Sequence, residues 1–368
     1  MTRIEATGSG EALLALFERH GCVHVETAVL QPADIFIDLS GEDIRRRLFL
    51  TQDGSGTDLC LRPEHTIPVC RQHVESGQAS GEYCYLGPVF RQRQDGSGEF
   101  HQVGFESIGR TDECPADADA LGLALDGFAL AHDAPYAVRV GDMGLLSAVL
   151  DALEVPPPAR RRLRRHLTSG AGRDAALSPP ERGAGADYAG LISAIAGQDP
   201  KAARAFVEDV ISIAGVSRVG GRTAGEIAER FLSKAENRSG ELSGRAREVL
   251  SRYLAIRGDL DEASDAVRTL AHEERLDLAA ALDRFEERTG FIAAREIPLQ
   301  RLTFAADFAR TLDYYTGFIF EIGQEGRQDV PYVAAGGRYD RLFEHVGEGA
   351  VPAVGCSFWL DRFPEGAR

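Results

Sequence analysis

The hydrophobic and polar positions of this chain change their period along its length. Towards both ends, apolar residues come in short runs bounded by glycine, proline or acidic residues, which is typical of β-strands. These runs cover 58–63, 83–90, 99–109 and 136–142 and, in the C-terminal part, 317–322, 331–337 and 353–358. Two strand-rich regions are therefore predicted, with a long segment of different character between them.

Helices are predicted between several of these strands. Pro63 and Glu64 are both favoured at the start of a helix, so residues 63–76 are predicted to be helical. The alanine- and leucine-rich stretch 117–134 is a second predicted helix.

The middle of the chain has the pattern of helices and few strand signals. Leu278, Leu282 and Phe285 recur at the i, i+4, i+7 spacing of one helix face, and the stretch LSPPERGAGA is typical of a loop. We therefore predict an α+β fold, an antiparallel sheet flanked by helices with a helical inserted domain. Residues 1–150 and 297–368 form its discontinuous core, and 151–296 form the mainly helical insert.

Composition favours a soluble globular protein. The 368 residues are 43% hydrophobic and 27% charged, and the net charge is −16. An acidic chain is poorly suited to broad binding of nucleic acid, which requires neutralisation of phosphates. The basic run ARRRLRRHL at 159–167 is interpreted as a solvated helix face, with an RNA contact as the alternative.

The cysteines and the hydropathy profile exclude several other classes. The six cysteines form no CxxC pair and are irregularly spaced, so we expect buried thiols rather than disulfides or a metal site. No apolar run approaches the ~20 residues of a membrane span, and the N-terminus lacks an export signal. A cytoplasmic protein without metal or cofactor is therefore expected.

The strand EFHQVGFESIG carries the first candidate chemistry. Alternate residues of a strand share a face, so Gln102, Gly104 and Glu106 lie together, opposite His101, Val103 and Phe105. Glycine between two polar side chains permits the close approach of a ligand. The alternative is an ordinary solvent-facing side of the sheet.

Two further segments place polar residues next to strands. In ARTLDYYTGFIFEI, Arg310 is suited to bind a carboxylate or phosphate, although a surface ion pair with Asp313 explains it equally well. In AAGGRYDRLFEHV, a glycine pair and Arg338 stand between a predicted strand and a predicted helix. A glycine pair alone is also typical of a tight turn.

Taken in order, these segments resemble the motifs of the histidyl-tRNA synthetase family. The motifs are LRPEHT, GPVFRQR with FHQVGFESIG, ARTLDYYTGFIFE, AAGGRYDRL and PAVGCSFWLDRF, and the resemblance covers residues 10–145 and 297–363. It implies a class II synthetase antiparallel sheet. It also implies pairing of two copies through the segment 24–39, and a loop between 90 and 99 that derives from an ATP- and tRNA-binding loop.

The resemblance also implies a histidine pocket. Its residues would be Glu64, Thr66 and Gln102 at the α-amino group, Glu106 and Tyr315 at the imidazole, Arg310 at the carboxylate, and Tyr314 and Tyr339 beside them. These residue types suit their roles, because acids bind an ammonium group and a guanidinium binds a carboxylate. Arg91 and Arg362 match arginines of the family's nucleotide site and are expected to be vestigial.

The sequence departs from the synthetase pattern in three places. The loop after Arg91 is short and has Arg93 where the family has glutamate, and His65 follows Glu64 where the family has glycine. The chain ends at Arg368, which leaves no room for the family's C-terminal anticodon-binding domain. We therefore expect neither tRNA binding nor aminoacylation.

With these departures the chain resembles a paralogous family, the regulatory subunits of short-form ATP phosphoribosyltransferase. The stretch GDMGLLSAVLDAL and the loop FRQRQDGSGEFHQ are closer to that family. It implies a non-catalytic role in the first step of histidine biosynthesis, with feedback control by L-histidine and a homodimer that assembles with the catalytic subunit. The alternative is a truncated synthetase-like enzyme that activates histidine with ATP.

Overall fold

The computed structural model describes residues 8–45, 47–93, 97–132, 134–169, 172–178, 242–310, 314–326 and 331–363. Contacts divide the chain into two compact units, one of Met1–Ala152 with Arg252–Arg368 and one of Leu153–Ser251. Every strand found among the described residues belongs to the first unit, as do the segments that carry Glu64, Gln102 and Arg310. Helices α12 (Leu260–Glu274) and α13 (Ala279–Ala294), which the sequence analysis assigned to the insert, belong to this first unit.

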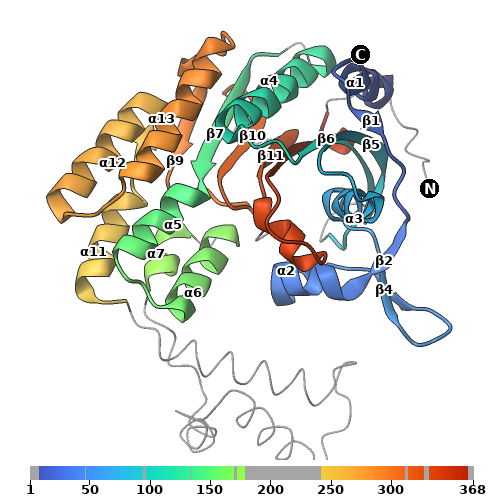
Figure 1. Ribbon diagram of the computed structural model, residues 1–368, viewed down its shortest axis with the longest axis horizontal. Coiled ribbons are helices and arrows are strands. Elements are labelled where there is room, and N and C mark those ends of the chain that lie inside the picture. The colour runs from blue at the N-terminus through green and yellow to red at the C-terminus, as the bar shows by residue number, and fades with distance from the viewer. Residues whose placement is uncertain are drawn as a thin grey trace, which may run out of the picture. The chain divides into compact units, whose positions relative to one another are not determined.

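The first unit is built on a large, mostly antiparallel sheet (Figure 1). Its strand order is β1-β5-β6-β12-β11-β10-β7-β9-β8, and only the pairs β1–β5 and β7–β9 are parallel. The strands are β1 (Val23–His24), β5 (Gly81–Phe90), β6 (Glu99–Ile108), β7 (Tyr136–Asp142), β8 (Arg257–Gly258), β9 (Leu302–Ala305), β10 (Phe318–Gln324), β11 (Ala334–Arg338) and β12 (Ala353–Trp359). The predicted fold class is therefore confirmed.

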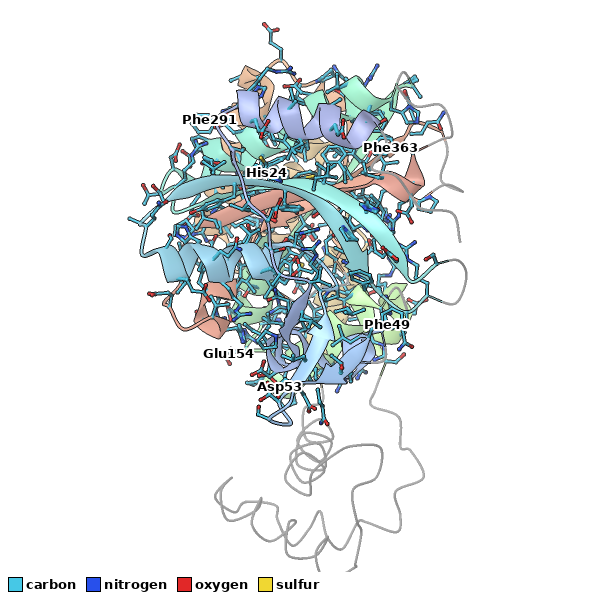
Figure 2. The ribbon with its side chains drawn as sticks, turned by 90° about the vertical axis from the view of Figure 1, so that its right-hand side faces the viewer. His24, Phe49, Asp53, Glu154, Phe291 and Phe363 are labelled. Carbon is cyan, nitrogen blue, oxygen red and sulfur yellow. The ribbon has the colours of Figure 1, made fainter. Side chains whose placement is uncertain are left out.

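Helices cover both faces of this sheet. Helices α1 (Gly8–Arg19) and α4 (Glu113–Ala131) pack on one face, where the ring of Phe17 meets that of Phe105 at 5.0 Å. Helix α3 (Thr66–Ser76) lies on the other side of β5 and β6 (Figures 1 and 2). The Thr66 hydroxyl at its start donates to Glu106, the neighbour of Phe105 on the opposite face. Glu106 and Phe105 thus point to different layers, as the alternation predicts.

The start of α3 follows from the sequence LRPEHT. The Glu64 carboxylate accepts the backbone N–H of Thr66 at 2.7 Å and that of Ile67 at 2.8 Å, two donors that a helix start leaves without a partner. The helix therefore begins at Thr66, three residues later than predicted. Glu64 is fixed at the same time beside the sheet, where the candidate site residues of β6 lie.

The remaining elements of the first unit lie around this sheet. A smaller sheet has the order β2-β4-β3, with β2 (Leu30–Pro32), β3 (Leu50–Gln52) and β4 (Asp58–Leu61), and α2 (Ala33–Arg45) follows β2. Helix α5 (Met143–Ala152) continues from β7, and short 3-10 helices cover Leu299–Arg301, Asp340–His345 and Leu360–Arg362. The helix predicted after the glycine pair is thus a 3-10 helix over Asp340–His345.

The second unit contains α6 (Pro157–Thr168), α7 (Gly172–Leu177) and most of α11 (Gly244–Tyr253). The basic run 159–167 forms α6, in which Arg162, Leu163 and Leu167 are buried. Only part of the run is therefore a solvated face. The predicted insert also includes 179–241, which lie outside the described residues.

Candidate functional site

Three small residues lie side by side in adjacent strands of the large sheet. Gly104 of β6 pairs with Ser357 of β12, and Ser357 pairs with Ala335 of β11. A Cβ atom at Gly104 would lie 2.5 Å from the Tyr85 hydroxyl and 2.4 Å from a backbone oxygen, so only glycine fits there. Of these three residues, Ala335 and Ser357 form the floor of a cavity, whereas the Tyr85 hydroxyl fills the space over Gly104.

The cavity above this floor is small and polar. Its volume is about 40 Å³, which accommodates water molecules but is smaller than an amino acid. It is lined by Glu64, Thr66, Arg91, Gln102, Arg310, Tyr314, Tyr315, Tyr332, Ala335, Ser357 and Trp359. Six of the eight residues predicted for a histidine pocket are brought together here, and Arg91 joins them. Glu106, Tyr339 and Arg362 are not part of the lining.

Glu106 lies directly beside this cavity, bonded to residues around it. Its carboxylate accepts the hydroxyl of Thr66 at 2.7 Å, that of Tyr85 at 3.2 Å and that of Tyr339. Gly355, its partner on β12, makes room for it, since a Cβ there would meet the Glu106 Oε2 atom at 1.7 Å. Burial raises the pKa of Glu106 to about 8. A contact of Glu106 with an imidazole stays a prediction.

Arg310 is held at the cavity by an acid and an aromatic ring. Its Nη1 atom lies 3.4 Å from Glu321, and its guanidinium lies 4.6 Å from the centre of the Tyr332 ring. The guanidinium of Arg362 also lies 4.6 Å from the centre of the Tyr332 ring. Burial alone would raise the pKa of the Tyr332 phenol, but the two arginines outweigh it and lower that pKa to about 8. The cavity wall at Arg310 is therefore strongly electropositive.

Three buried polar atoms of the lining have no hydrogen-bond partner among the described residues. They are the acceptor Gln102 Oε1 and the donors Arg310 Nε and Trp359 Nε1. Buried polar groups in folded proteins are nearly always paired, so unpaired ones on a common cavity indicate a ligand or ordered water. A set with a free acceptor at one strand and two free donors nearby suits a zwitterion, with an ammonium group and a carboxylate.

The arginines of the expected nucleotide site are engaged with the protein itself. Arg91 donates from Nε to the Pro63 carbonyl at 2.6 Å. Arg362 donates to the Tyr332 carbonyl at 2.9 Å and lies 4.6 Å from the centre of the Trp359 ring. Arg93, in the same loop as Arg91, forms an ion pair with Asp361 at 2.6 Å. These contacts direct the guanidinium groups towards neighbouring side chains and backbone.

His65 lies behind the cavity lining. Its ring stacks on Tyr85 at 4.5 Å and its Nε2 atom lies 3.3 Å from the Gly87 carbonyl. Burial lowers the pKa of this imidazole to about 3, so the ring is neutral at physiological pH. His65 therefore fills space between α3 and β5 and is absent from the lining.

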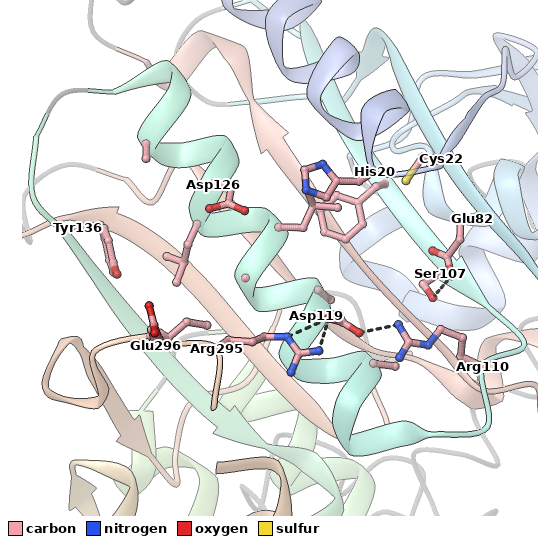
Figure 3. A pocket seen from close by; sticks show the side chains of 18 of the residues that line it. His20, Cys22, Glu82, Ser107, Arg110, Asp119, Asp126, Tyr136, Arg295 and Glu296 are labelled. Atoms are coloured by element: carbon pink, nitrogen blue, oxygen red, sulfur yellow. Dashed lines mark hydrogen bonds and ion pairs between the residues drawn. The ribbon is translucent and has the colours of Figure 1, made fainter. Parts of the chain in front are cut away.

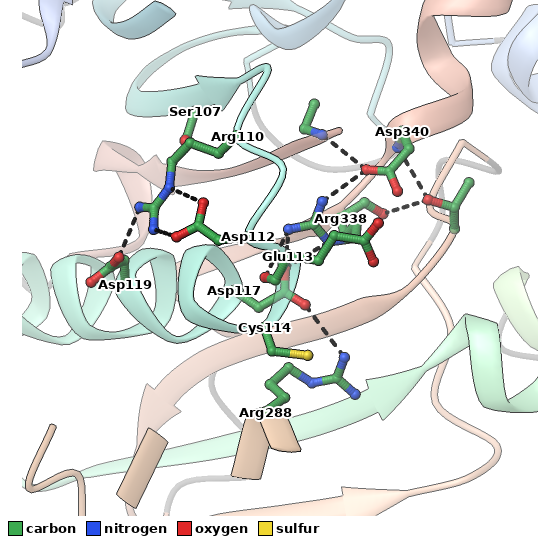
Figure 4. A network of polar contacts seen from close by, with 12 residues as sticks. Ser107, Arg110, Asp112, Glu113, Cys114, Asp117, Asp119, Arg288, Arg338 and Asp340 are labelled. Carbon is green, nitrogen blue, oxygen red and sulfur yellow. Dashed lines mark hydrogen bonds and ion pairs between the residues drawn. The ribbon is translucent and has the colours of Figure 1, made fainter. Parts of the chain in front are cut away.

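A buried charge network holds the strand end that carries Tyr339 (Figure 4). Asp117 of α4 accepts Arg338 Nε at 2.8 Å and Arg288 Nη1 at 3.3 Å. Arg338 also contacts Asp340 at 3.0 Å, so both neighbours of Tyr339 are fixed. The network thereby connects α4 and α13 with the segment from which Tyr339 reaches Glu106.

Sequence reasoning missed four residues of the lining, Tyr332, Ala335, Ser357 and Trp359. The signal for two of them was present, because Ser357 and Trp359 alternate with Cys356 and Phe358 and so share a face with Gly355. What the sequence could not supply was the register, which places Trp359 opposite Gln102. Tyr332 precedes β11 and carries no such periodic signal.

A larger cavity of about 710 Å³ lies along α4 and includes His20, Arg110, Asp119 and Arg295 in its lining (Figure 3). Three of its charged side chains pair with one another, since Asp119 accepts Arg110 Nη1 at 2.8 Å and Arg295 Nε at 2.9 Å. Glu82 likewise accepts the Ser107 hydroxyl at 2.7 Å. None of its polar side-chain atoms is among the buried unpaired ones of the described chain. The smaller cavity is therefore the better candidate site.

The cysteines and possible metal ligands complete the chemistry of the described residues. All six cysteines are buried and free, and burial raises the pKa of each thiol, so none is activated as a nucleophile. Within the described ranges no group of three His, Cys, Asp or Glu side chains is placed to hold a metal ion. No helix in that part of the chain is long and apolar enough to span a membrane.

Comparison with known proteins relates this geometry to two groups of relatives. The family described as Histidyl-tRNA synthetase matches residues 5–208 and 231–363. A solved structure from Bacillus halodurans, described as an ATP phosphoribosyltransferase regulatory subunit/histidyl-tRNA synthetase, superposes with a TM-score of 0.66 at 19% identity, covering 98% of this chain and 78% of the other. A histidine–tRNA ligase subunit from Alicyclobacillus acidocaldarius gives 0.57 at 23% identity, covering 99% and 94%. These structures establish the fold.

Closer relatives establish the family. An ATP phosphoribosyltransferase regulatory subunit from Mesorhizobium japonicum is 43% identical over 361 residues, which cover 94% of both chains. One from Brucella canis is 40% identical over 344 residues, covering 92% of this chain and 91% of the other. The chain therefore belongs to the family of ATP phosphoribosyltransferase regulatory subunits, on a histidyl-tRNA synthetase-like fold.

Proposed function

We propose that this chain is the non-catalytic subunit through which L-histidine controls a short-form ATP phosphoribosyltransferase, and that histidine binds in the small cavity lined by Gln102 and Arg310. The observation that carries the proposal is the pair of unpaired atoms Gln102 Oε1 and Arg310 Nε on one cavity wall. A free amino acid supplies a partner to both, through its ammonium group and its carboxylate.

The other lining residues suit the rest of the ligand. Glu64 is buried and lines the same cavity as Gln102, which suits the binding of an ammonium group. The rings of Tyr314 and Tyr315 have their centres 4.7 Å apart and are tilted by 43° to each other, and they offer aromatic surface and hydroxyl groups to an imidazole. Glu106 acts on the ligand through the Thr66 hydroxyl, which it accepts. It also contacts the ligand directly once one of the three hydroxyl groups bonded to its carboxylate moves away.

Histidine binding requires the cavity to widen. At about 40 Å³ it cannot hold an amino acid, so at least one lining side chain moves outward when the ligand enters. Tyr332 is the suitable one, because it is only partly buried while Gln102, Tyr314 and Trp359 are buried. Ligand entry is then coupled to a displacement of Tyr332, which contacts both Arg310 and Arg362. Such a movement provides a structural signal that the catalytic partner can read.

We expect the purified chain to catalyse no histidine-dependent exchange between ATP and pyrophosphate, and no charging of histidine tRNA. The reason is that Arg91, Arg93 and Arg362 are held by Pro63, Asp361 and Tyr332, instead of facing a nucleotide. The measurement is a radiolabelled exchange assay with an authentic histidyl-tRNA synthetase as the positive control. Exchange above background would favour the alternative, a truncated enzyme that activates histidine.

We also propose a homodimer that forms through the segment 24–39 and its neighbours. Large apolar side chains are exposed there, among them Val23 at 62%, Leu30 at 51% and Leu50 at 48%. A cluster of exposed apolar residues at the edge strand β1 and the small sheet is typical of a surface that is covered by another chain.

The Leu30→Glu variant should weaken this dimer. Burying an unpaired carboxylate costs about 2 kcal/mol or more, so the dissociation constant should rise about 30-fold or more. Leu130→Glu is the matched control, since Leu130 is similarly exposed but lies on α4. Analytical ultracentrifugation over a concentration series measures both. A wild-type monomer, or equal weakening by both substitutions, would contradict the proposed interface.

The proposed role itself is tested by reconstitution with the short catalytic subunit. The two chains should co-purify, and the rate of phosphoribosyl transfer to ATP should increase when this chain is added. A catalytic subunit whose rate and elution volume are unaffected by this chain would refute the role. The exchange assay and this reconstitution together distinguish the subunit from a histidine-activating enzyme.

A further inference from the structure

We infer that Trp359 is a ligand-binding residue of this cavity, and that its indole N–H donates a hydrogen bond to the carboxylate of the bound amino acid beside Arg310. The inference rests on the proposed function and deepens it, because it names the group that reads the ligand's carboxylate together with the guanidinium. It concerns a residue that the motif comparison assigned to no role.

The first observation is the position of Trp359 in the sheet. It is the last residue of β12 and pairs with Gln102 of β6, whose amide oxygen is one of the unpaired atoms of the cavity. Residues paired in this way have Cβ atoms about 5 Å apart. Trp359 lines the cavity and is 4% exposed. Its side chain therefore lies where a ligand held by Gln102 would also lie.

The second observation is the unpaired donor. Trp359 Nε1 is buried and has no acceptor among the residues that the structure describes. An indole nitrogen is a donor only, and buried tryptophans usually find a partner for it. The cost of a buried unpaired donor is about 1–3 kcal/mol, which a ligand oxygen would remove.

The third observation is the positive charge around the ring. The guanidinium of Arg362 lies 4.6 Å from the ring centre and that of Arg310 lies 5.7 Å from it. Tyr332 completes the cluster by packing edge-on against the indole at 5.2 Å. An acceptor that reaches Trp359 Nε1 is thus drawn to two cations, which favours an anionic oxygen over a neutral one. A carboxylate fits this environment, and an imidazole or an ammonium group does not.

Packing alone accounts for the ring but not for the nitrogen. Trp359 belongs to a core cluster with Val89, Phe100 and Ala335, and phenylalanine would serve this packing without an unpaired donor. The residue therefore has two separable functions, and a substitution can remove one of them. Trp359→Phe keeps an aromatic ring against Arg362 and removes the N–H.

The test compares L-histidine with histidinol, which lacks the carboxylate, by calorimetric titration of wild type and Trp359→Phe. We expect Trp359→Phe to weaken histidine binding by about 10-fold or more and to leave the affinity for histidinol within about twofold of the wild-type value. Equal losses for both ligands, or no loss for either, would overturn the inference. Phe358→Leu is the control for core damage, because Phe358 is buried on the opposite face of β12 and packs against Phe17.

A second measurement needs no substitution and decides the matter if Trp359→Phe does not fold. Trp359 is the only tryptophan of the chain, so protein labelled with ¹⁵N-tryptophan has a single indole N–H resonance. Histidine should move this resonance downfield, as expected for a new hydrogen bond to an anion, and histidinol should move it less. An indole resonance that responds equally to both ligands refutes the inference. If wild type binds no histidine at all, the proposed function itself is wrong.

Discussion

Arg310→Ala is expected to weaken the binding of L-histidine by about 10- to 150-fold, measured by calorimetric titration. The substitution removes one of the two arginines that line the cavity, and a hydrogen bond between charged groups contributes about 1.5–3 kcal/mol. The fold should tolerate the change, because Glu321 keeps Arg139 as a partner at 2.5 Å. The loss should be much smaller for histidinol, which has no carboxylate for the guanidinium to bind.

Arg139→Ala is the matched control for this prediction. Arg139 contacts the same Glu321 carboxylate, but its side chain is 48% exposed and does not line the cavity. We expect histidine affinity within about twofold of wild type for this variant. If both substitutions weaken histidine equally, the effect comes from Glu321 and the sheet edge, and the cavity assignment is wrong. If neither does, histidine binds elsewhere.

Asp117→Ala is expected to lower the free energy of unfolding by about 3–5 kcal/mol. Asp117 is 1% exposed and lies between Arg338 and Arg288, so its removal leaves two guanidinium groups with less compensating charge in the interior. Asp340 still pairs with Arg338 and Asp142 with Arg288, which keeps the expected loss within that range. Urea denaturation followed by circular dichroism measures the change.

The exposed pair Arg341–Glu344 gives the comparison for this network. Its atoms lie 3.0 Å apart and its side chains are 70% and 38% exposed, so Arg341→Ala should cost at most about 1 kcal/mol. A loss for Asp117→Ala no larger than that for Arg341→Ala would show that the buried charges are not coupled. The network would then give Tyr339 no special support.

The local pattern of apolar and polar residues predicted the strands and one face of the candidate site. It did not predict that this face is buried. The alternation in EFHQVGFESIG correctly placed Gln102 and Glu106 on one side of β6, yet the same pattern is typical of a solvated strand. Whether that side is buried depends on α3, which the chain brings across the sheet from a distant segment. Gln102 and Glu106 are both 1% exposed, so the solvent-facing alternative is wrong.

Partners that are distant in sequence were the hardest to foresee. Arg310 was placed near Asp313, which lies outside the described residues, whereas its ionic partner in the structure is Glu321 on β10. Glu321 reaches it because β10 pairs with β11 and places Glu321 opposite Ala335 in the floor of the cavity. The hydroxyl groups that surround Glu106 likewise come from three segments that are distant from one another in the sequence. Register between strands decides such contacts, and a single sequence does not encode it visibly.

The predicted helical insert, 151–296, and the second compact unit, Leu153–Ser251, end at different residues. A periodic face such as Leu278, Leu282 and Phe285 shows that a helix buries one side, but not what it packs against. In the structure α13 packs on α4, and its Arg288 joins the network of Asp117. Helices α12 and α13 are thus grouped with the sheet, although their sequence resembles that of the preceding helical segment.

The most direct test is the rate of phosphoribosyl transfer by the reconstituted complex as a function of L-histidine concentration. We expect this chain, as wild type or as Arg139→Ala, to activate the catalytic subunit equally and to give complexes that are equally sensitive to histidine. The Arg310→Ala complex should be equally active but need about 10- to 150-fold more histidine for half-maximal inhibition. If histidine inhibits the Arg310→Ala complex at the wild-type concentration, the cavity lined by Gln102 and Arg310 is not the regulatory site, and the proposed control by histidine at this cavity is wrong.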